Sequence, residues 1–142
     1  MKKNVTFKNR AINMAGNLYL PNDFSDNKKY AAIVCVHPGS SVKEQTAGIY
    51  AGKLAAHGFV TLAFDASYQG ESGGEPRYIE EPTARVEDIR SAVDYLTTLE
   101  FVDPDRIRCL CRRRLLCKCS HDRASYQSSR YSGRCQYRQN IS

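Results

Sequence analysis

An abrupt change of composition after Ile107 divides this chain of 142 residues into two unequal parts. Residues 1–107 carry 12 lysines and arginines against 14 aspartates and glutamates, a net charge of −2. Residues 108–142 carry 9 basic residues and 1 acidic residue, a net charge of +8, together with 5 of the 6 cysteines. The second part has no regular apolar period, so it lacks the pattern with which a helix or strand buries one face. Only the first part has the sequence pattern of a folded domain.

The first part contains four stretches that are typical of strands. Residues 4–8 and 13–20 predict two short strands, and turn-forming residues follow them. Residues 30–36 form a continuous apolar, β-branched-rich run, and residues 59–64 repeat this pattern. Such runs indicate strands that are buried on both faces, as in a parallel sheet.

Two helices are predicted between and after these strands. Residues 44–57 bring apolar side chains onto one helical face, and Gly58 follows where a left-handed cap is favoured. Pro82 opens a second helix, in which apolar residues recur every three or four positions. Residues 101–106 read as a turn that leads into a strand beginning at Ile107. We therefore expect an α/β fold whose sheet is mostly parallel, with helices on both faces.

Three motifs follow these elements in a fixed order. Residues 36–41 read Val-His-Pro-Gly-Ser-Ser at the end of a buried strand. Residues 65–74 fit Asp-x-x-x-x-Gly-x-Ser-x-Gly after the next strand, and residues 103–107 read Asp-Pro-Asp-Arg-Ile. In this order, the motifs resemble those of the N-terminal half of an α/β hydrolase, particularly of the dienelactone-hydrolase-like and peptidase-like esterase branch. The resemblance covers residues 4–107 and stops at Arg108.

The resemblance implies a parent activity, which is hydrolysis of esters or related acyl bonds through a serine or cysteine nucleophile. It implies a small-molecule acyl substrate and no cofactor. The first motif would supply an oxyanion loop, made of His37, Pro38, Gly39, Ser40 and Ser41. The second motif would supply the loop after the next strand, with Asp65, Gly70, Ser72 and Gly74.

Catalytic residues are not expected in this chain. The family's order of nucleophile, acid and base places all three after the break, where the family pattern is absent. Gly-Glu-Ser-Gly-Gly around Ser72 imitates a nucleophile motif, but a loop follows it instead of a helix, so we expect a turn. Ser120-His121-Asp122 spells a catalytic triad consecutively, whereas triad members converge from separate segments. We expect His37 to shape the oxyanion loop and the chain to be inactive.

The genetic code suggests an origin for residues 108–142. With suitable synonymous codons, a shift of one nucleotide turns residues 117–122 into Val-Asn-Ala-Ala-Met-Thr and residues 126–130 into Ile-Lys-Ala-Val. The same shift turns residues 108–114 into Gly-Val-Cys-Ala-Gly-Gly, which is a nucleophile elbow of the Gly-x-Cys-x-Gly kind. Each stretch supplies an element that the fold lacks. We therefore expect that the segment is out of frame and disordered, and that the domain is truncated before its nucleophile strand.

Two other interpretations of residues 108–142 stay open. Cys109, Cys111, Cys117, Cys119 and His121 are soft ligands of the kind that bind zinc, although Cys-x-Cys spacing is unusual in structural sites, and we expect no metal. The arginines, with interspersed tyrosines, could contact nucleic acid through phosphates and stacked bases. We expect a solvated, disordered segment instead, because it has few large apolar groups to offset the entropy of ordering, and we expect its contact with nucleic acid to be non-specific.

The remaining expectations concern location and packing. No apolar run is long enough to span a membrane and no secretion signal is evident, so we expect a cytoplasmic protein without membrane contact. If the sheet ends before its nucleophile strand, an open edge should leave four core side chains accessible: Val34, Val36, Val60 and Leu62. Cys35 should be protected, and the cysteines after Ile107 should be exposed.

Overall fold

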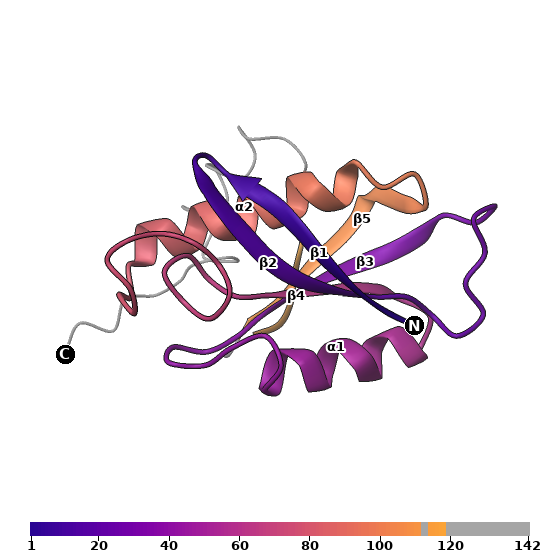
Figure 1. The fold of residues 1–142 in the computed structure, drawn as a ribbon. Coiled ribbons are helices and arrows are strands. Elements are labelled where there is room, and N and C mark those ends of the chain that lie inside the picture. The colour runs from indigo at the N-terminus through magenta and orange to yellow at the C-terminus, as the bar shows by residue number, and fades with distance from the viewer. Residues whose placement is uncertain (112–113, 119–142) are drawn as a thin grey trace.

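The computed structural model describes residues 1–111 and 114–118 as six strands and two helices (Figure 1). The strands are β1 (Lys2–Asn9), β2 (Ile12–Tyr19), β3 (Tyr30–Val36), β4 (Val60–Phe64), β5 (Val102–Cys111) and β6 (Arg114–Lys118). The helices are α1 (Thr46–Ala56), between β3 and β4, and α2 (Pro82–Thr97), between β4 and β5. Both helices and the first four strands lie where the sequence predicts them.

The strands form one sheet in the order β1-β2-β4-β3-β5-β6. β3 runs parallel to both of its neighbours, β4 and β5. The pairs β1 with β2, β2 with β4, and β5 with β6 are antiparallel. The α/β class is therefore confirmed, but the sheet is mixed rather than mostly parallel.

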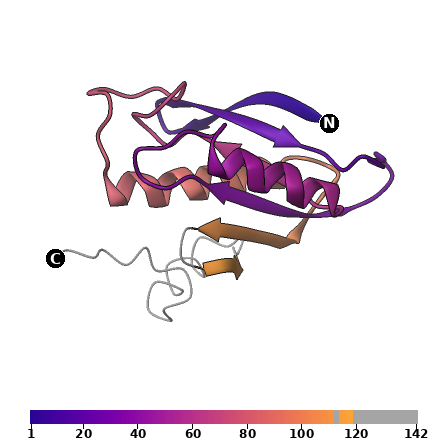
Figure 2. The same cartoon turned by 90° about the horizontal axis from the view of Figure 1, so that it is seen from below.

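The two helices cover opposite faces of the sheet, as expected (Figure 2). Alternate residues of β3 serve the two faces, since successive strand side chains point in opposite directions. Ala32 and Val34 belong to the large core under α2, and Ile33 and Cys35 belong to the small core under α1. β3 is therefore buried on both faces, which explains its unbroken apolar sequence.

The α1 face is thin because the helix presents alanines to the sheet: Ala47, Ala51 and Ala55 are buried. The chain leaves α1 through Gly58, which has a positive φ of 95° and donates its N–H to the carbonyl of Ala55. This is the left-handed cap that the sequence predicts.

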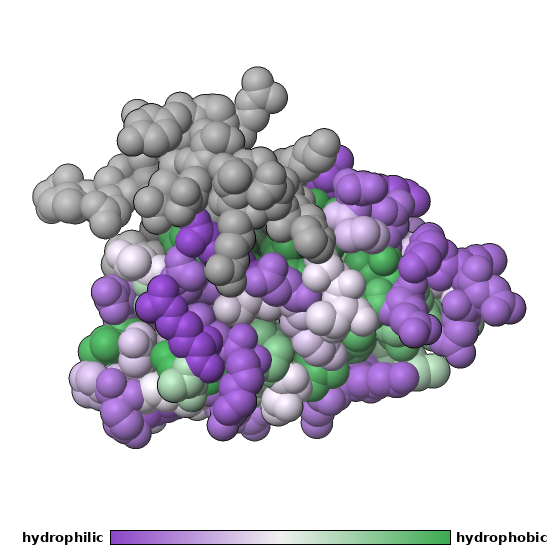
Figure 3. All heavy atoms as spheres, turned by 90° about the horizontal axis from the view of Figure 1, so that it is seen from above, coloured by the Kyte–Doolittle hydropathy of each residue, from purple (hydrophilic) through white to green (hydrophobic). Residues whose placement is uncertain are grey.

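On the face seen in Figure 3, polar side chains surround small apolar patches, as on an ordinary protein surface.

β5 continues past the composition break, so the expected boundary after Ile107 falls inside a strand. Its pairing with β3 skips from Val102 to Ile107, a register shift in the stretch where the sequence predicts a turn and the structure has a strand. β5 and β6 also cover the edge that we expected to be open. Val34, Val60 and Leu62 are fully buried and Val36 is half-buried, so the expected access to the first three is wrong.

Cys109 also differs from expectation. It lies in β5 with 2% of its surface exposed, about as buried as Cys35 at 1%. Its burial follows from the continuation of β5, which turns its side chain toward the core under α2. Expectations about residues 119–142 lie outside the described residues. Within the described part, no helix is both long enough and apolar enough to cross a membrane.

Candidate functional site

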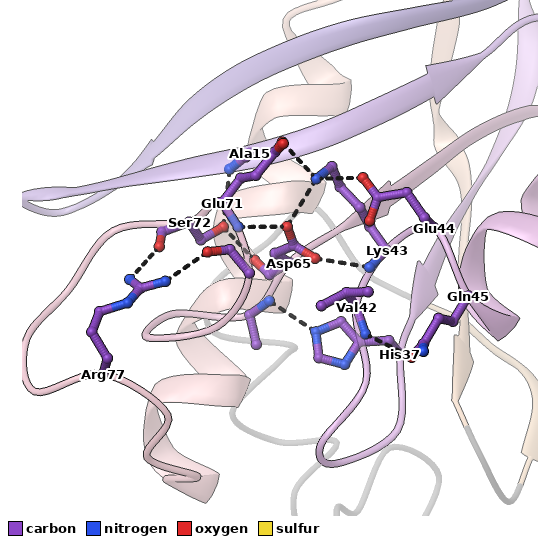
Figure 4. Close-up of polar contacts among 12 residues, drawn as sticks. Ala15, His37, Val42, Lys43, Glu44, Gln45, Asp65, Glu71, Ser72 and Arg77 are labelled. Carbon is purple, nitrogen blue, oxygen red and sulfur yellow. Dashed lines mark hydrogen bonds and ion pairs between the residues drawn. The ribbon is translucent and has the colours of Figure 1, made fainter.

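Two loops meet beyond the carboxyl ends of β3 and β4 (Figure 4). Residues 37–45 connect β3 to α1 and contain the expected oxyanion loop, and residues 65–81 connect β4 to α2. Ligands of open α/β sheets bind at the carboxyl ends of the strands. Four sets of polar contacts hold these two loops.

His37 joins the first loop to the second. Its Nε2 accepts a hydrogen bond from the backbone N–H of Ala66 at 3.0 Å, and its Nδ1 lies 2.7 Å from the carbonyl oxygen of Pro38. Because Nε2 accepts, the ring proton is on Nδ1, which donates to Pro38. Burial lowers the pKa of His37, and the positive charge of Arg85 acts in the same direction. A neutral imidazole with both nitrogens engaged supports the interpretation of His37 as a shaping residue.

Arg85 and Glu80 hold the middle of the first loop. The guanidinium of Arg85, on α2, donates to the carbonyl of His37 at 2.9 Å and to Glu80 at 2.7 and 3.2 Å. Oε1 of Glu80 then accepts from the N–H of Ser40 at 3.4 Å. Burial alone would raise the pKa of Glu80, but the hydrogen bond and charge of Arg85 outweigh it and lower that pKa. Glu80 is therefore anionic beside the loop's backbone.

Lys43 and Asp65 hold the far end of the same loop. The N–H of Lys43 donates to Oδ1 of Asp65 at 2.8 Å, and the Lys43 ammonium donates to Oδ2 at 2.9 Å. The ammonium also contacts Glu44 and Glu71, each at 2.8 Å. Burial alone would lower the pKa of Lys43, but hydrogen bonds to the three carboxylates outweigh it and hold that pKa above its usual value.

Ser72 is a structural residue of the second loop. Its Oγ donates to the carbonyl of Asp65 at 2.6 Å and accepts from the N–H of Ala15 at 3.0 Å, and the residue is only 2% exposed. Arg77 donates to the carbonyls of Gly70 and Ser72 at 2.6 and 2.5 Å. The next helix begins only at Pro82. This geometry supports the interpretation of Ser72 as part of a turn.

The carboxyl end of β5 lies beside that of β3, where Cys35 pairs with Leu110. A nucleophile elbow needs a strand that turns sharply into a helix. Within the described residues, β5 instead turns back into antiparallel β6. Within the described part of the chain, therefore, no such elbow follows β5.

Sequence reasoning missed Lys43, Glu80, Arg85 and Asp88. Arg85 and Asp88 are buried on the side of α2 that faces the sheet. The prediction of this helix used only its apolar residues. Asp88 accepts from Ser67 N–H at 2.9 Å and from the Asn9 side chain at 2.7 Å. Burial raises the pKa of Asp88 against these hydrogen bonds. A usable signal was the position of Arg85 and Asp88 four residues before Ile89 and Ala92, which places them on the same helical face as these apolar residues.

Within the described residues, no group of three or more histidine, cysteine, aspartate or glutamate side chains is arranged to hold a metal ion. The side chains of Cys111, Cys117, Cys119 and His121 lie outside the described set, as does Ser120-His121-Asp122. The zinc and nucleic-acid interpretations therefore stay predictions.

The chain is similar to several known proteins. It is 56% identical over 110 residues to the uncharacterized protein YcjY of Escherichia coli, covering 75% of this chain and 36% of YcjY. The crystal structure of hypothetical protein PA2218 from Pseudomonas aeruginosa matches with a TM-score of 0.71 and 44% identity, over 77% of this chain and 34% of that one. The α/β hydrolase GrgF from Penicillium sp. matches with a TM-score of 0.68 and 22% identity, over 77% of this chain and 36% of that one.

The chain spans about a third of the length of these three proteins. No protein-family model matches it. The sheet order, the helices on both faces and the structural neighbours agree with one another. The described part of this chain is therefore a partial α/β-hydrolase fold.

Proposed function

We propose that this chain carries the oxyanion-loop half of an acyl hydrolase, whose parent activity is hydrolysis of esters or related acyl bonds. The position of residues 37–41 is the observation that carries the proposal. They lie between β3 and the following helix, which is where α/β hydrolases place one oxyanion-stabilising N–H. They also lie beside the end of β5, next to the place of a nucleophile. The similarity to GrgF supports the same reading.

We infer further that the chain as it stands does not catalyse this reaction. Acyl transfer needs an activated nucleophile, and no histidine of the described loops has a free nitrogen with which to activate one. His37 is engaged at both nitrogens. The hydroxyl of Ser72 is buried and hydrogen-bonded to backbone groups.

We propose that residues 108–142 are translated out of frame. The change of charge at Arg108 supports this. The shifted frame reads a cysteine at position 110, which is Leu110 here and pairs with Cys35 at the end of β3. That position pairs with a residue two places before the start of the oxyanion loop.

Sequencing the coding DNA tests the frame directly, because a shift of one nucleotide after codon 107 should open a hydrolase-like continuation. The continuation should then be expressed with residues 1–107 and assayed on 4-nitrophenyl esters of short acids. We expect turnover from this protein, none from the chain as it stands, and none when the cysteine read at position 110 is replaced by alanine. Shifted codons without such a continuation would refute the frame proposal, and an inactive continuation would refute the activity.

The alternative is a binding protein that uses its basic, cysteine-rich segment. The net charge of +8 over residues 108–142 favours it. Retention of RNA that weakens steeply with salt but not with sequence would support nucleic-acid binding. Stoichiometric zinc, lost together with Cys117→Ser, would support a metal site.

A further inference from the structure

The Lys43 side chain carries the most deeply buried ammonium among the described lysines. Only 3% of it is exposed, and its two outer partners, Glu44 and Glu71, are 50% and 75% exposed. The third partner, Asp65, is as buried as the ammonium itself, with 1% exposed. Removing a charge from water is costly unless its partners satisfy it fully, so an inward-facing ammonium needs a structural or functional reason.

The contacts of Asp65 suggest what this ammonium does. One carboxylate oxygen accepts the N–H of Lys43 from the first loop, and the other accepts the Lys43 ammonium and the N–H of Glu71 from the second loop. Gly70 passes so close that a β-carbon there would overlap the carboxylate. A single carboxylate therefore sets the distance between the two loops, and Lys43 neutralises it (Figure 4).

We propose that Lys43 and Asp65 are positioning residues. They hold the carboxyl-side end of the oxyanion loop in the conformation needed to bind an oxyanion, before any substrate binds. The purpose assigned to the loop rests on the function proposed above, whereas the mechanical link does not. Oxyanion donors are effective when they are already fixed where charge will develop. Lys43 lies two residues after Ser41, so its displacement would carry the loop's N–H groups with it.

The other end of the loop has its own anchors. His37 is bound to Ala66, and its carbonyl is bound to Arg85. Loss of Lys43 should therefore free one end of the loop and leave β3 in place. Loss of a residue that only stabilises the fold would instead accelerate amide exchange in the loop and in the strands alike.

Amide hydrogen exchange of the full chain tests this difference. In Lys43→Met, we expect the amides of Lys43 and Glu71 to exchange at least about tenfold faster, because both donate to the Asp65 carboxylate that the ammonium holds in place. The amides of β3 and β4 should change by less than about twofold. Lys43→Arg keeps the charge and should restore most of the protection.

Glu71→Gln is the matched control, because it removes an exposed partner of the same ammonium and should leave the loop protected within about twofold. Equal acceleration in loop and strands, or an unchanged loop in Lys43→Met, would overturn the proposal. If Lys43→Met does not fold, the double variant Lys43→Met/Asp65→Asn removes both buried charges and is better tolerated. A protected loop in that variant would also overturn it.

The outcome is separate from the test of hydrolysis. Local loop acceleration with an inactive in-frame protein would keep the positioning link and refute the proposed function. Equal acceleration of exchange in loop and strands, together with an active in-frame protein, would refute the positioning link and keep the proposed function.

Discussion

The carboxyl ends of β3 and β5 lie side by side in the sheet, but the chain continues from them in opposite ways. After β3, hydrogen bonds of His37, Ser40 and Lys43 hold the loop, and α1 follows. After β5, within the described residues, the chain turns back as the antiparallel strand β6. The side-chain hydrogen bonds of the first loop go to its own residues, to the loop after β4 and to α2, although β3 itself pairs with β5. The difference teaches that side-chain contacts can hold the loop at one strand end without a side-chain contact from the strand end beside it.

The largest expected effect tests whether β5 is packed as firmly as β3. Ile107 is fully buried in β5, so Ile107→Ala should lower the free energy of unfolding by about 2–5 kcal/mol through lost burial and a residual cavity. Urea unfolding followed by circular dichroism measures it. Leu110→Ala, at a half-buried position of the same strand, should cost clearly less. Equal small losses from both variants would mean that β5 does not pack on the core.

The next effect tests how closely the loop after β4 packs around Asp65. Gly70 has a φ of +50° and no room for a β-carbon beside Asp65, so Gly70→Ala should cost about 2–4 kcal/mol from backbone strain and overlap. Gly58→Ala is the matched control, since Gly58 has a φ of +95° but nothing within 4 Å of the added carbon. It should cost only about 1–2 kcal/mol. Similar losses in the two variants would argue against close packing around Asp65.

Ser72→Ala separates stability from catalysis. It removes the hydroxyl that joins the carbonyl of Asp65 to the N–H of Ala15, so unfolding should become easier by about 1–3 kcal/mol. Hydrolysis of 4-nitrophenyl acetate by the chain should equal that of the variant at background level. Turnover that disappears with Ser72→Ala would make Ser72 a nucleophile and remove the contrast between the two ends.

The smallest effect is a pH dependence that arises from His37. Burial lowers its pKa in the folded state, so the unfolded chain binds more protons once the pH falls below about 6.5, the ordinary value for histidine. The stability that neutral His37 contributes is therefore complete above that pH and is lost as the pH falls toward the folded-state pKa. The loss is at most about 1.4 kcal/mol per pH unit.

The His37 contribution is measured as the difference between the chain and His37→Gln in urea unfolding from pH 7.5 to 5. The subtraction removes the effect of Asp88, whose raised pKa acts in the opposite sense. Parallel pH profiles for the two proteins would show that His37 is not held neutral at the end of β3.

Much of the fold could be predicted because it depends on local pattern. The continuous apolar run of β3, the alanine face of α1 and the cap at Gly58 each follow from the neighbouring residues alone. The predicted loop residues His37 and Asp65 do lie at the carboxyl ends of adjacent strands, since parallel pairing brings such ends together. The mixed sheet was missed because pairing direction between distant strands leaves little trace in either strand's own sequence.

The contacts that define the site could not be predicted. The sequence separates Lys43 from Asp65 by 22 positions and Arg85 from His37 by 48, so neighbouring residues do not show which partners these side chains meet. A charged residue is usually a solvated one, so burial of Lys43 and Arg85 is a tertiary fact. The packing of Ile107 and Cys109 was likewise hidden behind a change of composition.

The sequence by itself determined the order of strands and helices, the two loop motifs and the break at Arg108, because each depends on residue type and spacing along the chain. Only the tertiary structure decided which polar groups meet across the two loops, that His37 is neutral and fully engaged, and that β5 runs on past the break. The physical reason is that buried polar groups must find partners wherever the fold places them. Those partners come from segments that the sequence does not connect.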